Sequence, residues 1–407
     1  MTIRFLPSIV VALIICIPAY AVSANWTLLV YIQTDADLNA AVCKNLYDLA
    51  RASADERVNV LLQIQMNGTA GLRCTIEGGK IQPVEIVSLT LNPQEDLKNG
   101  LQWAYGDYPA KHHALILGSH GFGILDPVWN DDAHDWRPEV MSDYQEACVV
   151  KKLSHNDHRG MLFDPYHQTY LNNESMVAAI SQVVTTTLNN QKIDIIGMDA
   201  CKMSMLEIAY QLAPYAHYIM GSQECELVDG YDYYACVNAL MYQANVESAA
   251  QSMVQSYEDY YQAIASKYTQ SAINTHAIAV IIDNINSIIQ HLVDNSSEYA
   301  GILAKVREQR TQFCEQPSYI DVYDFYNALA EAIADSSSDT LQTLLSLLDT
   351  GKTLVAQAVV ANVTGSKVPH AHGISIYYPI VYKPSSYAKC AFARDTLWIQ
   401  FLETFAL

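Results

Sequence analysis

The stretch "IDIIGMDACKMSMLEIAYQL", residues 193–212, is an apolar run that ends in Asp199-Ala200-Cys201 and continues into a helix-like pattern. An apolar run flanked by helical stretches is typical of a strand that is buried on both faces of a parallel sheet. In such proteins reactive side chains collect beyond the carboxyl ends of the strands. The position of Cys201 therefore predicts a reactive thiol at one edge of a parallel sheet.

Other segments extend this α/β pattern outward from the central run. Strands are predicted at residues 26–33, 58–66, 113–121 and 216–224, with a helix at 38–50. Their alternation with helices predicts an α/β fold, a parallel sheet covered on both faces. The three- and four-residue apolar spacing from about 246 to 362 predicts helices, and residues 372–379 predict a late strand.

This pattern suggests how the chain is organised. We expect an α/β core at residues 25–245 that carries the chemistry. A helical C-terminal part with a late strand, residues 246–407, is expected to pack on the same domain.

The N-terminal segment predicts export. Residues 1–24 contain Arg4, an apolar stretch and then small residues, which is the pattern of a signal peptide cut after Ala24. The mature protein is then expected to be secreted or periplasmic, with no later segment held in a membrane. The formal net charge of -20 disfavours nucleic acid as a partner, because phosphate binding needs a basic face.

A second predicted strand also ends in a reactive residue. Residues 115–119 lead into His120-Gly121, so neighbouring strands would bring an imidazole and the Cys201 thiol together. A cysteine nucleophile needs such a histidine to move its proton. Gly121 lets the backbone approach closely, and the amides of Gly121 and Cys201 are candidates for an oxyanion hole. The start of a helix after Cys201 would favour the thiolate through its dipole.

The segments "GSHGFG" (118–123) and "MDACKMSMLEIAYQL" (198–212) resemble the His-Gly and Asp-Ala-Cys motifs of clostripain-like cysteine peptidases, relatives of gingipains, legumains and caspases. The segments "WTLLVYIQTDADLN", "GSQECELVDGYDYY" and "HGISIYYP" are similar to further parts of that family. The resemblance implies a caspase-like αβα sandwich and hydrolysis of peptide bonds through a thioester. It makes Cys201 the nucleophile and His120 its acid–base partner.

The resemblance also implies protein or peptide substrates cut after Arg or Lys. A buried cation needs a paired carboxylate, so an acidic pocket is required. We expect Asp199 and Asp229 to form this substrate-binding pair, with Glu224, Glu226 and Asp232 close enough in sequence to replace Asp229.

Two alternatives keep the fold and change the function. The first has the same chemistry with Asn or Asp at the P1 position, the substrate residue before the cut bond. The second is a secreted binding protein that has lost activity. One departure from the family's pattern is Lys202 directly after the nucleophile, which we expect to point to solvent.

Residues 125–160 are polar and lack periodicity, which predicts a long surface loop. Peptidases of this kind are often zymogens that cut themselves between the His and the Cys. Lys151-Lys152 lies in this loop and fits a basic specificity, so we expect self-processing there.

The same loop raises the question of a metal. Asp131, Asp132, His134 and Asp135 suit Ca²⁺ or Zn²⁺, but their spacing matches neither an EF-hand nor a zinc motif. Cysteine–histidine hydrolysis requires no cofactor. Calcium binding by this loop is a hypothesis that rests on the residue types alone.

Overall fold

The computed structural model describes residues 24–34, 38–52, 56–125, 127–130, 135–138, 161–164, 166–309, 314, 316–335, 338–382 and 386–406. The expected signal peptide, except Ala24, lies outside these residues. So do Lys151 and Lys152, three of the four candidate metal ligands (Asp131, Asp132 and His134), and the side chain of the fourth, Asp135.

A central sheet organises the described part of the chain and contains nine strands there. In spatial order they are β14 (Val359–Thr364), β12 (Thr269–Asn274), β11 (Ala216–Gly221), β10 (Ile193–Asp199), β5 (Ala110–Gly118), β1 (Ala24–Thr34), β2 (Val58–Met66), β3 (Gly71–Glu77) and β4 (Lys80–Val87). The five middle strands, from β11 to β2, run parallel to one another. The two strands at each edge pair antiparallel.

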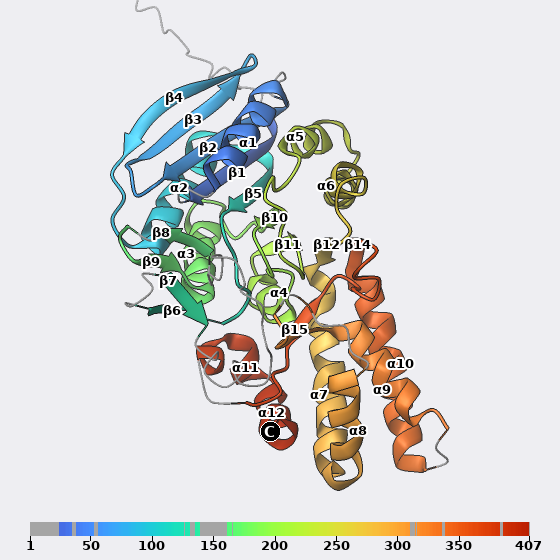
Figure 1. Cartoon of the computed structure of the whole chain (residues 1–407). Coiled ribbons are helices and arrows are strands. Elements are labelled where there is room, and N and C mark those ends of the chain that lie inside the picture. The colour runs from blue at the N-terminus through green and yellow to red at the C-terminus, as the bar shows by residue number, and fades with distance from the viewer. Residues whose placement is uncertain are drawn as a thin grey trace, which may run out of the picture.

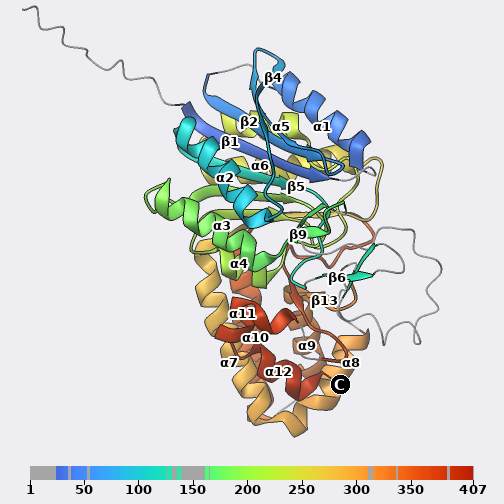
Figure 2. The same ribbon diagram turned by 90° about the vertical axis from the view of Figure 1, so that its left-hand side faces the viewer.

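Helices cover both faces of the sheet (Figures 1 and 2). One face carries α1 (Asn39–Ala52), α5 (Tyr233–Tyr242) and α6 (Val246–Tyr261), and the other carries α2 (Pro93–Asp107), α3 (Asn173–Thr186) and α4 (Leu206–Leu212). Alternate side chains of β1 enter the two cores: Leu28 and Val30 pack in the first, Leu29 and Tyr31 in the second. This alternation explains why the middle strands are apolar throughout and confirms the predicted α/β layers.

The remaining helices extend away from the sheet, as Figure 1 shows. They are α7 (Ile278–Asp294), α8 (Ser296–Gln309), α9 (Val322–Ile333), α10 (Asp339–Ala358), α11 (Ala391–Asp395) and α12 (Trp398–Phe405), with the short turns η3 (Thr275–Ala277) and η4 (Ser386–Lys389). Thr275–Asp294 is long and apolar enough to cross a membrane by length and composition, which differs from the sequence expectation. Its isoleucines, however, are buried in the same core as α2, α3 and α4.

Short strand pairs complete the described elements. They are β6 (Pro127–Asn130) with β7 (Asp135–Pro138), β8 (Met161–Asp164) with β9 (Thr169–Leu171), and β13 (Tyr319–Asp321) with β15 (Ser375–Tyr377). The late strand predicted from sequence is therefore β15, which lies outside the central sheet. The region predicted to be helical contains β12 and β14, so the C-terminal part supplies one edge of the central sheet.

Glu207 joins α4 to β15. Its side chain is fully buried, and Oε1 accepts hydrogen bonds from the Tyr377 amide at 2.8 Å and the Tyr387 hydroxyl at 3.1 Å. Burial raises the pKa of this carboxyl to about 7, although the hydrogen bonds oppose the shift. The folded protein therefore holds the proton of Glu207 more tightly than the unfolded chain does.

The first prediction concerns Glu207→Gln. A carboxyl whose pKa is raised by folding contributes stability below its unfolded pKa, and this is lost as pH rises through its folded pKa. From pH 4.5 to 8 the free energy of unfolding of the wild type should fall by on the order of 1–3 kcal/mol relative to that of Glu207→Gln. The glutamine keeps a carbonyl acceptor and cannot ionise. Urea unfolding of both proteins, each carrying Cys201→Ala to prevent self-cleavage, measures the difference.

Glu298→Gln is the matched control, because Glu298 is exposed on α8. The difference between its unfolding free energy and that of the wild type should change much less over this pH range than the difference for Glu207→Gln. If the unfolding free energies of Glu207→Gln and the wild type change with pH in parallel, folding does not raise the pKa of Glu207.

Candidate active site

The two segments that carry His120 and Cys201 leave the sheet side by side. Strand β10 pairs with β5 in parallel, with Asp199 opposite Gly118. Directly beyond the strands, the Ser119 amide donates a hydrogen bond to the Asp199 carbonyl at 3.2 Å. The condition on which the sequence argument depends, that these strands are neighbours, is therefore met.

Gly121 allows the two segments to touch. A Cβ atom at this position would lie 2.5 Å from the Cys201 carbonyl oxygen and 3.0 Å from the Cys201 nitrogen, so any larger residue would force the segments apart. Cys201, which makes this contact, and His120, the residue before Gly121, are both half-buried. The arrangement places His120 and Cys201 on adjacent segments, together with the two candidate oxyanion amides.

The segment after Cys201 is irregular where the sequence predicts a helix. Helix α4 begins only at Leu206 and has seven residues, so the prediction of a helix dipole directly at the thiol is wrong. The Lys202 amide bonds to the Glu224 carbonyl at 3.0 Å, and the Ser204 amide to that of Ser222 at 2.9 Å. Pairing with the loop after β11 has replaced the first helical turn.

The Cys201 thiol receives direct support from this loop. The amide of Glu226 donates to Sγ at 3.2 Å. The pKa of the thiol is nevertheless raised well above its ordinary value, first by a hydrogen bond with the Cys225 side chain and then by burial, while the Lys202 charge and the Glu226 amide oppose the shift. A thiol held protonated in this way needs a base before it can attack.

Lys202 does not point to solvent as predicted. Its backbone has a φ of +62°, and its side chain is buried with Nζ 5.4 Å from the centre of the Phe122 ring. A left-handed conformation is unfavourable for a residue with a Cβ and is found where surrounding contacts enforce it. Here those contacts are the Glu224 carbonyl and the aromatic face, which attracts a cation.

Asp199 is buried against the loop between β11 and α5. Its Oδ2 accepts hydrogen bonds from the Tyr233 hydroxyl at 2.7 Å and the Tyr231 amide at 3.3 Å. Burial outweighs these bonds and raises the pKa of Asp199 to about 6. A Cβ on Gly230 would lie 2.5 Å from Oδ2, so glycine is required for the loop to pass this close.

The other candidate carboxylates have different surroundings. Asp229 accepts a hydrogen bond from the Tyr260 hydroxyl of α6 at 2.7 Å. Asp232 caps α5 by accepting from the Ala235 amide, and Glu224 forms an ion pair with Lys267 at 3.4 Å.

Glu226 is the alternative with unused bonding capacity. Its Oε2 is buried and has no hydrogen-bond partner among the described residues. Burial, followed by the charge of Asp199, raises its pKa well above the ordinary value. Asp199, which is buried, and Glu226, which is half-buried with its Oε2 covered, are therefore two acids within electrostatic reach of each other, near Cys201.

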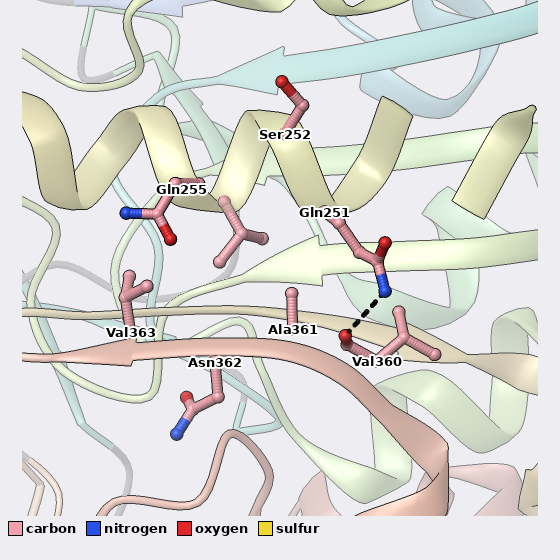
Figure 3. Close-up of a pocket in the computed structure, with 8 residues that line it drawn as sticks. Gln251, Ser252, Gln255, Val360, Ala361, Asn362 and Val363 are labelled. Carbon is pink, nitrogen blue, oxygen red and sulfur yellow. Dashed lines mark hydrogen bonds between the residues drawn. The ribbon is translucent and has the colours of Figure 1, made fainter. Parts of the chain in front are cut away.

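A pocket of about 410 Å³ lies elsewhere, between α6 and the edge strand β14 (Figure 3). The Gln251 side chain crosses it to donate to the Val360 carbonyl at 3.1 Å. None of its lining residues belongs to the segments of Cys201 or His120. Within the described ranges, no three His, Cys, Asp or Glu side chains are grouped as metal ligands would be.

Comparisons with known proteins agree with this architecture. The sequence model that describes the clostripain family matches residues 133–405 of this chain. This range includes Cys201 and begins after His120. A secreted C11 cysteine protease from Bacteroides thetaiotaomicron, solved with an irreversible peptide inhibitor, superposes with a TM-score of 0.63 at 17% identity, covering 93% of this chain and 100% of that one. An inactive zymogen C11 protease from Parabacteroides distasonis gives 0.61 at 18% identity, covering 93% and 98%. No curated protein matches the sequence.

These similarities confirm the caspase-like αβα fold predicted above. At such low identity the superpositions establish the fold alone. The family match establishes the class of protein, and the site residues rest on the contacts described here.

The second prediction tests the contact between the two segments. Gly121→Ala should lower kcat/KM for peptide hydrolysis by more than about tenfold, since displacement of a catalytic group by a fraction of an ångström has effects of this size. The melting temperature should change far less than the activity. Unchanged activity would show that the segments can separate without harm.

Gly301→Ala is the matched control for this substitution. An added Cβ at Gly301 on α8 meets nothing within 4 Å. The variant should keep full activity, with a stability gain of up to about 1 kcal/mol from the better helix former.

Proposed function

The chain belongs to the clostripain family of cysteine peptidases, and we propose that Cys201 is its nucleophile and His120 its acid–base partner. The observation that carries this proposal is the parallel exit of β5 and β10, which presses Gly121 against Cys201. Its substrates are proteins or peptides.

The proposed mechanism starts from the protonated thiol. His120 removes the proton of Cys201, and the thiolate attacks the peptide carbonyl. The amides of Gly121 and Cys201 stabilise the oxyanion. His120 then protonates the departing amine, which leaves a thioester on Cys201 that water hydrolyses. The charge of Lys202 and the amide of Glu226 stabilise the thiolate once it forms.

We further propose cleavage after Arg or Lys, with Asp199 at the base of the P1 pocket. Two acids are candidates for its partner: Asp229, expected from sequence, and Glu226. The oxygen of Glu226 that lacks a partner favours Glu226, because a buried carboxylate is stabilised most by a cation that fills its remaining bonding capacity. Acid pairs of this kind would repel Asp at P1.

Export and self-processing complete the proposal. The signal-peptide pattern at residues 1–24 supports secretion or delivery to the periplasm. Lys151-Lys152, between the proposed catalytic residues, matches the proposed specificity. Calcium binding near Asp131 and Asp135 stays a separate hypothesis.

The third prediction tests the class of chemistry and the self-processing together. Cys201→Ala should reduce hydrolysis of fluorogenic peptides with Arg or Lys at P1 to background, and it should leave a single chain on a denaturing gel. Peptides with Asn or Asp at P1 and parallel assays with calcium or a chelator complete the panel. Turnover by Cys201→Ala would refute the proposed nucleophile. Wild-type cleavage after Asn would show that Asp199 does not serve as the acidic base of the P1 pocket.

The fourth prediction distinguishes the carboxylates. Asp199→Asn and Glu226→Gln should each lower kcat/KM for an Arg substrate by about 10- to 100-fold, the value of one charge-assisted hydrogen bond. Activity on the matching citrulline substrate, which lacks the charge, should change little. Asp229→Asn is the matched comparison, and a larger loss there than in Glu226→Gln would return the role to Asp229.

A further inference from the structure

We propose that Cys225 is a redox partner of Cys201, and that the two thiols form a reversible disulfide that blocks the nucleophile. This inference rests on the proposed function of Cys201. It adds a modification site, made of two cysteines 24 positions apart in sequence, and names low-molecular-weight disulfides as the oxidants.

Backbone pairing brings the two cysteines together. The segment after Cys201 runs antiparallel to the loop after β11, held by the bonds from Lys202 to Glu224 and from Ser204 to Ser222. The first of these bonds joins the residue after Cys201 to the residue before Cys225, so the two cysteines lie close together.

Side-chain contacts agree with this placement. The amide that donates to Cys201 Sγ at 3.2 Å is that of Glu226, the residue directly after Cys225. A hydrogen bond between the two thiols is the main cause of the raised pKa of Cys201. The two thiols are therefore close to each other before any oxidation takes place.

Accessibility separates this pair from the other thiols. Cys201 and Cys225 are both half-buried. Four of the other described cysteines, namely Cys74, Cys236, Cys314 and Cys390, are buried. Cys43 is exposed, on α1. An oxidised Cys201 therefore has Cys225 as its immediate neighbour.

The chemistry is a two-electron exchange. The Cys201 thiolate attacks one sulfur of a small disulfide RSSR, which forms a mixed disulfide and releases RS⁻, protonated to RSH. The Cys225 thiolate then attacks Cys201 Sγ, forms the internal disulfide and releases a second RSH. Two protein thiols are oxidised and RSSR is reduced to two RSH. Excess RSH reverses both steps.

The disulfide has two consequences for the peptidase. It removes the thiolate, so hydrolysis stops until a reductant is present. It also protects the nucleophile, because a sulfur held in a disulfide does not proceed to the irreversible sulfinic and sulfonic acids.

The test uses the full-length protein in glutathione buffers of graded oxidised to reduced ratio, with acid quenching, alkylation of free thiols and mass mapping of tryptic peptides. Trypsin cuts after Lys192, Lys202 and Lys267, so Cys201 and Cys225 fall in different peptides. We expect these two peptides to become linked as hydrolysis is lost, and dithiothreitol to restore both free thiols and activity. Oxidation that leaves only a glutathione adduct on Cys201 would overturn the inference.

Two variants complete the design. Cys225→Ser should hydrolyse peptides under reducing conditions and, when oxidised, should carry glutathione on Cys201. Cys236→Ser removes the other thiol of the same tryptic peptide and should still form the link, whereas loss of the link there would assign it to Cys236. If Cys225→Ser does not fold, the wild-type mapping together with Cys236→Ser decides the question.

The outcome is separable from that of the proposed function. Hydrolysis by Cys201→Ala would refute the proposed nucleophile whatever the mapping shows. An inactive Cys201→Ala together with no 201–225 link in the oxidised wild type would refute this inference alone.

Discussion

The site depends on one constraint, the close passage of two chain segments where β5 and β10 end. The hydrogen bond from the Ser119 amide to the Asp199 carbonyl continues the sheet for one step beyond both strands. The missing side chain of Gly121 then lets the backbone rest on Cys201. Every role proposed for His120 and Cys201 requires this spacing, because proton transfer between two side chains needs them within hydrogen-bond reach.

A second layer of contacts fixes the nucleophile from the other side. Two buried hydroxyl groups of strand β12 form hydrogen bonds with the paired segments beside the site. The Ser271 hydroxyl lies 2.9 Å from that of Ser204, and the Thr269 hydroxyl lies 2.8 Å from that of Ser222. Because Ser204 and Ser222 are also joined through their backbones, β12 supports the two segments that bring Cys225 close to Cys201. A strand from the C-terminal part of the chain, the second from the edge of the sheet, thus holds a site whose proposed catalytic residues come from the N-terminal half.

The sequence predicted the middle of the sheet well and its edges poorly, for a physical reason. Middle strands are apolar on both faces and are easily recognised; residues 58–66 match β2 fully. Strand β12, "TQSAIN", is buried with polar side chains that find partners only in the folded protein, so its sequence carries no apolar period. The same limit applies to the site. Cys201, His120 and Asp199 follow recognisable strands, whereas the buried Lys202 and the contact with Cys225 depend on a loop path that no local pattern encodes.

Glu226 connects the two chemistries of this site. Its amide donates to Cys201 Sγ, while its carboxylate lies within electrostatic reach of Asp199. A substrate cation that neutralises these acids would therefore relieve the repulsion within the loop whose backbone supports the thiolate. Because this amide belongs to the residue after Cys225, a disulfide at Cys225 would also alter the hydrogen bond from the amide to Cys201 Sγ. Substrate charge and thiol oxidation would thus both affect the Cys201 thiol through one short stretch of chain, Cys225-Glu226.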